Sequence, residues 1–317
     1  MSDGPRKRKK NKRNGRKGGS ASAQERGETS APARQALSPE EVLREGLPGA
    51  TIETLKALGL LTAKGGASPH SNRKLKQIKH FMQLIAPALE DCFARHEDPL
   101  LIDAGAGRAA LSLAIYDQWI RPRGRGKLIA IEGRSALSER VRAVTEAAGY
   151  DRFEMKEARI LDAELPERVH FTLALHACDT ATDEAILRGL AHQSDHIALV
   201  PCCQAELARL LGEISGPLAP LWRRRWHRRE FGAQLINVLR AQLLQARGYA
   251  ITVTELAGWE HSLKNELILG RRVARYHAGA KRELEALLTE LPVCPWLLDA
   301  VAALDAGAPI PRPGEAT

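Results

Sequence analysis

The sequence contains few aromatic side chains, few cysteines and no long apolar run. Aromatic residues make up 4% of the 317 residues. No stretch reaches the roughly 18 consecutive apolar residues that a membrane-spanning helix needs, so we expect no membrane partner. The five cysteines are an odd number scattered through apolar segments, which indicates a reducing compartment, the cytoplasm. The charged amino terminus lacks the apolar core of a secretory signal, and none is expected.

The chain instead has a sizeable apolar fraction and an uneven excess of positive charge. Hydrophobic residues make up 44% of the sequence, and the formal net charge is +9. Nine lysines and arginines against one aspartate in residues 1–19 supply +8 of that charge. Because residues 1–36 contain almost no large apolar side chains, we expect a disordered basic tail. Such a tail either binds RNA phosphates or only increases solubility.

A buried strand, a glycine turn and a helix are predicted over residues 100–119. The apolar residues 100–102 suit a strand that is covered on both faces. Asp103 precedes the turn, and Gly105 and Gly107 let the backbone turn sharply without placing a side chain between it and a ligand. Open α/β sheets bind nucleotide-like ligands at such strand-to-helix turns.

The second predicted strand, residues 127–132, ends in an acidic residue. Glu132 lies 25 residues beyond Gly107. A carboxylate at the tip of this strand can accept hydrogen bonds from ribose hydroxyls. The alternative is a surface residue that caps the following helix.

Polar and reactive side chains follow the predicted fourth strand, residues 169–175. His176, Cys178, Asp179 and Asp183 come directly after it, where open α/β sheets place their chemistry. Neutral His176 or ionised Asp179 can serve as a general base, and these two are the predicted catalytic residues. Asp183 fits the N-cap of the next helix, which is a structural role.

Two adjacent cysteines, Cys202 and Cys203, follow the predicted fifth strand, residues 196–200. They are either small buried thiols beside a ligand or metal ligands that share a site with His176 or Cys178. Nothing in the spacing supplies a full set of ligands, so no metal is predicted.

Residues 221–229 combine five arginines with Trp222, Trp226 and His227. Arginine pairs with phosphate, and aromatic rings stack on unpaired bases, so this segment predicts RNA contact. The alternative is a basic loop whose tryptophans pack inward. The residues assigned to RNA contact are Arg223, Arg224, Arg225, Trp226, Lys264 and Asn265.

The chain from about 71 to 273 resembles class I S-adenosylmethionine (SAM)-dependent methyltransferases. The resemblance rests on D-A-G-A-G at 103–107, H-A-C-D-T-A-T-D at 176–183, P-C-C at 201–203 and E-H-S-L-K-N at 260–265. A related combination of motifs occurs in eukaryotic tRNA 2′-O-methyltransferases. The resemblance implies an α/β, Rossmann-like fold: a seven-stranded, mostly parallel sheet whose last strand is antiparallel.

The resemblance also implies SAM as the cofactor, bound across the ends of strands one, two and four. In many of these enzymes an acid after the third strand receives the adenine amino group. Here Arg159 stands at the expected position, and Asp162 follows three residues later. The predicted cofactor-binding residues are Asp103, Gly105, Gly107, Glu132, Asp162 and His176.

Four segments are predicted along the chain. They are a disordered basic tail (1–36), a small helical cap (37–70), a methyltransferase domain (71–273) and a helical extension (274–317). Within the domain, helices are expected over 72–95 and 230–245, and the closing pair of strands over 249–256 and 266–269.

The predicted function is methyl transfer from SAM to RNA, a tRNA or an rRNA, by direct in-line displacement. One alternative is attack on a cytosine by a thiolate of Cys178 or Cys202. Others are a methyltransferase that acts on protein or on a small molecule, and a non-catalytic RNA- or ribosome-associated protein that keeps the fold.

Overall fold

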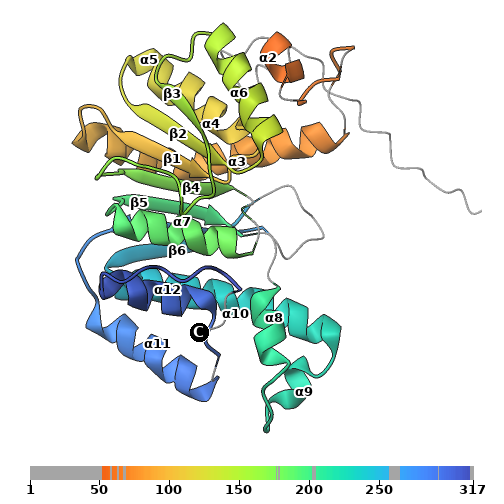
Figure 1. The fold of residues 1–317 in the computed structure, drawn as a ribbon, viewed down its shortest axis with the longest axis vertical. Coiled ribbons are helices and arrows are strands. Elements are labelled where there is room, and N and C mark those ends of the chain that lie inside the picture. Colours follow the sequence, from red (N-terminus) through yellow and green to blue (C-terminus); the bar gives the residue numbers. More distant parts are fainter. Residues whose placement is uncertain are drawn as a thin grey trace, which may run out of the picture. The chain divides into compact units, whose positions relative to one another are not determined.

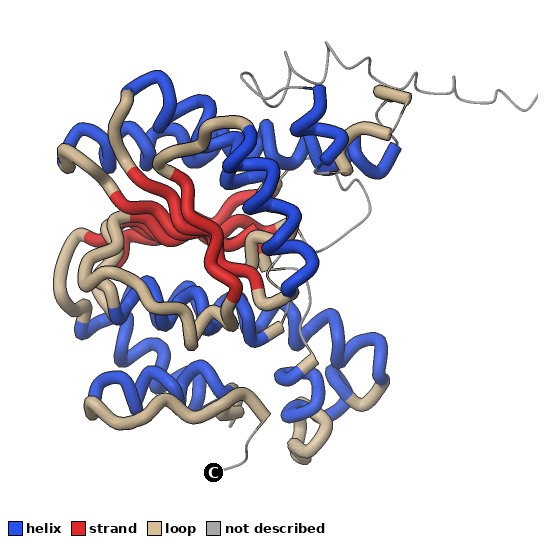
Figure 2. The backbone as a smooth tube through the Cα atoms, turned by 45° about the horizontal axis from the view of Figure 1, so that its top comes forward, coloured by secondary structure: helices blue, strands red, loops and turns tan. Residues whose placement is uncertain are grey.

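Seven strands form one sheet with helices on both faces (Figure 1, Figure 2). The computed structural model describes residues 52–57, 59–62, 64–66, 69–175, 177, 179–201, 205–256, 265–291 and 293–314. The predicted tail and the first part of the predicted cap lie outside these residues. The strands are β1 (Leu100–Ala104), β2 (Lys127–Glu132), β3 (Phe153–Glu157), β4 (Phe171–Leu175), β5 (His196–Val200), β6 (Tyr249–Glu255) and β7 (Glu266–Arg272).

The strand order is β3-β2-β1-β4-β5-β7-β6. The first five strands pair in parallel, and β7 runs antiparallel to both β5 and β6. From β1 the chain builds outward to β3 and then returns to the other side of β1 with β4, so a switch point lies between β1 and β4. The predicted fold class is confirmed.

Helices precede β1, follow β7 and lie in several of the connections between the strands. Before the fourth strand they are α2 (Ile52–Ala57), α3 (Pro69–Arg95), α4 (Ala110–Ile115), the π-helix η1 (Tyr116–Ile120), α5 (Arg121–Arg123) and α6 (Ser135–Ala147). After it they are α7 (Thr180–Ala191), α8 (Glu206–Leu211), α9 (Ala219–Trp222), α10 (Arg225–Ala246), α11 (Ala278–Glu290) and α12 (Trp296–Asp305). None of the described helices is long and apolar enough to span a membrane.

The side chains of each strand alternate between the two faces of the sheet, and each face carries its own hydrophobic core. Leu101 packs with α3 and α4 on one face of the sheet, and its neighbour Ile102 packs with α7 and α10 on the other. Successive side chains of a strand point to opposite faces, and because both faces are covered, all five residues of β1 are buried. This double cover explains why the sequence reads there as a continuous apolar run.

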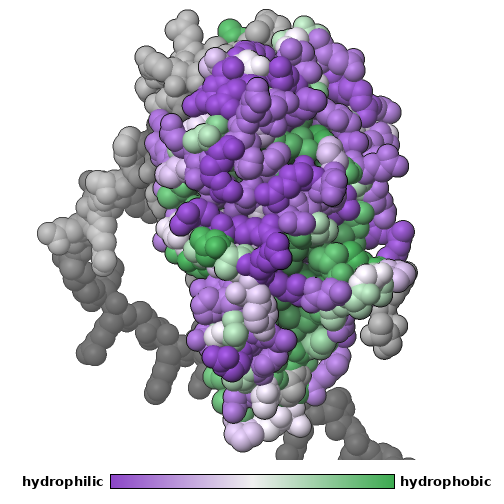
Figure 3. Space-filling model, turned by 90° about the vertical axis from the view of Figure 1, so that its left-hand side faces the viewer, coloured by the Kyte–Doolittle hydropathy of each residue, from purple (hydrophilic) through white to green (hydrophobic). Residues whose placement is uncertain are grey.

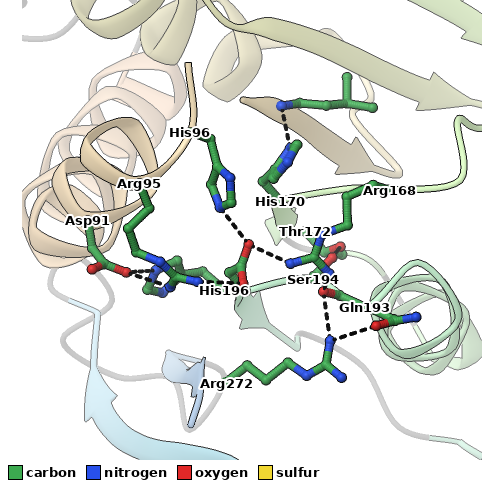
Figure 4. A network of polar contacts seen from close by, with 12 residues as sticks. Asp91, Arg95, His96, Arg168, His170, Thr172, Gln193, Ser194, His196 and Arg272 are labelled. Atoms are coloured by element: carbon green, nitrogen blue, oxygen red, sulfur yellow. Dashed lines mark hydrogen bonds and ion pairs between the residues drawn. The ribbon is translucent and has the colours of Figure 1, made fainter. Parts of the chain in front are cut away.

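A network of ion pairs ties the end of α3 to the amino ends of β4 and β5 (Figure 4). The buried carboxylate of Asp195 accepts hydrogen bonds from Arg95 over 3.0 Å and from Arg168 over 2.8 Å. His96 Nε2 lies 2.9 Å from the same carboxylate, and its ring lies 4.1 Å from that of His170, centroid to centroid. The face where the parallel strands begin is largely hydrophilic, with hydrophobic patches in its middle and lower part (Figure 3).

Candidate active site

The described site residues come from the carboxyl ends of neighbouring strands. Because β1, β2, β4 and β5 are parallel, these ends meet at one edge of the sheet, on the right in Figure 1. The switch point between β1 and β4 opens at this edge, which is where open α/β sheets bind their ligands.

The turn after β1 owes its shape to its backbone conformation. Gly105 has a φ of +76° and Gly107 a φ of +59°, in the left-handed region that glycine adopts without strain. A Cβ on Gly105 would lie 3.6 Å from the Cβ of Ala177, which is ordinary contact, so the backbone angle rather than crowding requires glycine. The amides of Gly105 and Ala106 both donate to the carbonyl of Ile131 over 2.9 Å, which fixes the turn to the end of β2.

Asp103 is buried at the start of the turn. Its carboxyl group is 1% exposed and accepts a hydrogen bond from the Ser112 hydroxyl of α4 over 2.5 Å. Burial raises the pKa of Asp103 to about 6, although the Ser112 hydrogen bond and the nearby charge of Lys74 oppose the rise. Asp103 thus connects β1 to the helix that follows the turn.

Glu132 ends β2 and faces the same turn. Its Oε2 accepts a hydrogen bond from the Gly107 amide over 3.0 Å, and its Oε1 accepts from the Arg134 amide over 3.0 Å. The Arg134 guanidinium also donates to both oxygens, over 2.8 and 3.0 Å. Burial alone would raise the pKa of Glu132, but these hydrogen bonds outweigh it and hold the pKa below its usual value. Glu132 is therefore an ionised acceptor at the β2 tip.

Several predicted residues lie outside the described part of the chain. They are His176, Cys178, Cys202, Cys203 and Lys264. Within the described part, no three or more metal-ligating side chains gather into a group.

Asp179 lies in the turn that leads from β4 into α7. Its backbone angles, φ 53° and ψ −124°, are ones that glycine adopts far more readily than aspartate. Its carboxylate accepts a hydrogen bond from the Ala205 amide over 3.2 Å, which links the loop after β4 to the start of α8. The carboxylate of Asp179, which is predicted to act as a general base, thus also holds two loops together through this hydrogen bond.

The prediction that Asp183 caps α7 is wrong. The helix begins at Thr180 with Asp179 at the N-cap position, so Asp183 falls in the first turn and points into the core. It is fully buried and forms an ion pair with Arg240 of α10, Oδ1 to Nε, over 2.6 Å. Burial raises the pKa of Asp183 against the opposing charge of Arg240. Arg240 also donates to Asn237 over 3.1 Å and to the carbonyl of Asp179 over 3.2 Å.

The arginine–tryptophan segment places its two tryptophans in different environments. Trp222 is buried, its ring lies 5.8 Å from that of Phe231 in a tilted arrangement, and its indole donates to the carbonyl of Ile214 over 3.2 Å. Trp226, in the first turn of α10, is 69% exposed. The arginines assigned to RNA contact around it, Arg223, Arg224 and Arg225, are all exposed. Helices α8 and α9 lie on the side of the molecule where the parallel strands end (Figure 1).

Asp162 and Asn265 do not lie where the sequence placed them. Asp162 is half exposed and faces Arg312 of the carboxyl-terminal segment, 3.7 Å away. Ile160, rather than Asp162, approaches the turn, with its Cδ1 3.9 Å from the place of a Cβ on Gly105. Asn265 is 3% exposed, so its side chain lies within the protein and not on the surface that carries Trp226.

Sequence reasoning did not identify Arg240 or Arg134 as parts of this region. Arg240 left a signal, because it is the only charged residue between Phe231 and Ala246, in the middle of an apolar helix face. A lone charge in such a position indicates a buried partner. Arg134 left none, since a surface arginine after a strand is common.

The fold and the glycine turn with its acidic neighbour define the class: this is the class I SAM-dependent methyltransferase fold. A family model described as a methyltransferase domain matches residues 73–210, which span β1 to β5 and the loops between them. The protein is a SAM-dependent methyltransferase, and its cofactor is SAM.

Solved structures of several methyltransferases are similar to this chain. SAH-bound PaMTH1 from Podospora anserina has 11% identity and a TM-score of 0.44, over 74% of this chain and 92% of that one. The 23S rRNA methyltransferase ErmE has 18% identity and a TM-score of 0.39, over 72% and 89%. An rRNA methylase from Streptococcus thermophilus has 12% identity and a TM-score of 0.36, over 56% and 88%. A search of curated proteins finds no matching sequence.

The described residues fit this cofactor. The two glycines of the turn carry no side chains, and a Cβ on Gly107 would meet only the flexible end of Arg134, at 3.8 Å. The ionised Glu132 supplies acceptors for ribose hydroxyls. The carboxyl groups of Asp103 and Glu132 lie close enough to affect each other's charge, which favours a ligand with a positively charged sulfur.

Proposed function

We propose that the protein methylates RNA, a tRNA or an rRNA, by direct in-line transfer in the cytoplasm. The observation that carries the proposal is the exposed Trp226 among exposed arginines at the start of α10. This segment directly follows α9, which Figure 1 shows on the side of the sheet where the parallel strands finish. An exposed indole offers a stacking surface to an unpaired base, and guanidinium groups pair with the flanking phosphates.

In this proposal the chain keeps its predicted organisation. Residues 71–273 form the catalytic domain, residues 37–70 a cap and residues 274–317 a packing extension. Residues 1–36 act as a basic arm that binds RNA phosphates, and Lys264 adds a further positive charge for them. The buried Asn265 is left out of the proposed RNA contact. The closer relation to tRNA 2′-O-methyltransferases, based on the motifs at 176–183 and 201–203, is part of the same proposal.

Binding and catalysis fall to different residues. Bound SAM supplies a methyl group on a cationic sulfur, which a nucleophile attacks in line. Glu132 accepts hydrogen bonds from the ribose hydroxyls of SAM. Gly105 and Gly107 leave the backbone of the turn accessible to the ligand, and Asp103 holds the turn to α4 through its hydrogen bond with Ser112. Asp162 is the residue predicted for the adenine edge, but it faces Arg312 over 3.7 Å, and we assign it no part in the binding of SAM. His176 or Asp179 removes the proton of the acceptor group as it is methylated.

The test is to incubate the full chain with radiolabelled SAM and separate extracts of total RNA, protein and small molecules. We expect label in RNA that nuclease removes and protease does not. Asp103→Ala, which weakens the cofactor site, serves as the inactive control. Label in protein or in a small molecule would give the enzyme a different substrate, and no label in any fraction would favour a non-catalytic RNA-binding protein.

A further inference from the structure

A cavity of about 230 Å³ lies beside α7, away from the glycine turn. Its walls come from α7, from the segment that follows β3 and from the carboxyl-terminal segment. Three arginines line it, Arg159, Arg188 and Arg312, with one carboxylate, Asp162, and an apolar wall that includes Leu161 and Leu187. At about 30 Å³ per water molecule, the volume holds a tetrahedral anion and part of the group attached to it.

Of the three arginines that line the cavity, Arg188 is the one without a counter-charge among the described residues. Its Nε is buried without a hydrogen-bond partner among the described residues, and its guanidinium donates to the carbonyl of Ala163. No carboxylate of the described chain lies within ion-pair distance of Arg188, although such pairs form elsewhere in the structure. Burial lowers the pKa of Arg188, which is the effect of a charge removed from water without compensation. A guanidinium in this position is stabilised by an anion from outside the chain.

The other two arginines are only loosely paired. Arg159 lies 3.9 Å from Glu184, and Arg312 lies 3.7 Å from Asp162, both near the limit for an ion pair. The side chains of Arg159 and Arg312 are 51% and 55% exposed, so they can reorient toward a ligand. Guanidinium forks match phosphate oxygens in geometry and charge.

We infer that this cavity is a phosphate-binding site, built on Arg188 and completed by Arg159 and Arg312. It is separate from the methyl-transfer site, because Arg188 lies eight residues along α7 from Thr180, about 12 Å at the rise of an α-helix. The phosphate belongs either to a free small molecule or to RNA. The inference does not depend on RNA as the methylated substrate.

Calorimetry with inorganic phosphate tests the site in the full chain, without SAM or RNA. We expect phosphate to bind and to raise the melting temperature, while sodium chloride at equal ionic strength does neither. Arg188→Met is expected to weaken phosphate binding at least tenfold and to leave the melting temperature without phosphate unchanged or higher, since it removes an uncompensated charge. The matched control is Arg282→Gln, an exposed arginine of α11, which keeps phosphate binding intact.

Arg312→Gln provides a second variant that removes a half-exposed arginine and disturbs no buried contact. It is expected to weaken phosphate binding about threefold. Absence of phosphate binding in the unmodified chain, or equal binding in both variants, would overturn the inference. A fall in RNA affinity in Arg188→Met would assign the phosphate to RNA. Phosphate binding that is lost in Arg188→Met, with RNA affinity unchanged, would assign it to a small ligand.

Discussion

Arg240 and Asp183 form a fully buried ion pair between α10 and the first turn of α7, Nε to Oδ1, over 2.6 Å. The same guanidinium holds the carbonyl of Asp179, the residue with the strained backbone at the end of the β4 loop. The position of that loop therefore depends on Arg240, which lies 61 residues further along the chain than Asp179.

Removing Arg240 should therefore destabilise the protein strongly. Arg240→Met leaves the Asp183 carboxyl buried without its partner, and we expect the free energy of unfolding to fall by about 3–5 kcal/mol. Urea denaturation measures it. The double variant Arg240→Met with Asp183→Leu removes both charges and should recover most of the loss, whereas additive losses would show that the pair is not coupled.

Glu132 should control cofactor affinity through its charge. Glu132→Gln keeps the size of the side chain and loses the ionised acceptor, so we expect SAM to bind about tenfold more weakly by calorimetry. Glu146→Gln, an exposed change on α6, is the control and should bind SAM normally. Unchanged affinity in both Glu132→Gln and Asp103→Ala would remove these residues from the cofactor site.

Asp179 offers a way to separate chemistry from loop geometry. Asp179→Asn retains an acceptor for the Ala205 amide but cannot take a proton, so turnover should fall by about 10²-fold or more while SAM affinity stays constant. Asp179→Gly suits the backbone angles and removes both the proposed base and the Ala205 hydrogen bond, so its difference from Asp179→Asn reports the loss of the Ala205 bond. His176→Ala should behave like Asp179→Asn if both residues act in catalysis. Equal losses of turnover and SAM affinity would make Asp179 structural.

Trp226 and Trp222 should differ sharply when each is replaced by alanine. Trp226→Ala removes an exposed ring, so RNA affinity should fall by about 1–3 kcal/mol with no change in stability. Trp222→Ala removes a buried ring and should lower the free energy of unfolding by about 3–5 kcal/mol. Filter binding and urea denaturation measure the two effects. Normal RNA binding by Trp226→Ala would show that this surface does not contact RNA.

The histidines where the strands begin should make the fold acid-sensitive. His170 Nδ1 accepts a hydrogen bond from the Leu100 amide over 2.9 Å, and His196 Nε2 lies 2.7 Å from Asp91. Burial lowers the pKa of His170, with help from the nearby charges of His96 and Arg168. Burial also lowers the pKa of His196, although Asp91 opposes it.

A histidine with a lowered pKa in the folded state binds fewer protons there than in the unfolded chain. Such a histidine stabilises the folded state above pH 6.5, which is the pKa of histidine in the unfolded chain. This contribution to the free energy of unfolding is lost as the pH falls from 6.5 through the pKa in the folded state. We expect the urea midpoint to drop between pH 6.5 and 5. His170→Asn, which keeps an acceptor for the Leu100 amide, should flatten this slope, and the exposed His227→Asn should not. A midpoint that does not change over this range would contradict the prediction.

The strands could be predicted because they are short apolar runs bounded by polar residues. The bounds of β2 and β5 follow directly from residues 127–132 and 196–200. The helix after β4 was harder, because two aspartates in the same motif both suit an N-cap. The choice between them depends on the backbone angles of Asp179 and on the distant Arg240.

The parts of the site that could be predicted are those formed by residues close together in the sequence. The glycine turn and Glu132 lie within one strand-turn-helix unit and the next strand, so spacing alone brings them together. Trp222 and Trp226 look equivalent in sequence, yet the bend between α9 and α10 buries one and exposes the other. The cavity around Arg188 is lined by three segments that are far apart in the sequence, and no local sequence pattern predicts that they lie together.

The Arg134 side chain, which is 69% exposed, already donates to both carboxylate oxygens of Glu132 that a ribose would use. An incoming nucleoside therefore competes with the Arg134 guanidinium for the Glu132 carboxylate, rather than with water. A sugar with both hydroxyls replaces the two departing guanidinium contacts one for one. A deoxy sugar would leave one carboxylate oxygen with only its backbone amide donor, from Gly107 or Arg134, so the enzyme can disfavour deoxynucleosides at this contact without any steric barrier.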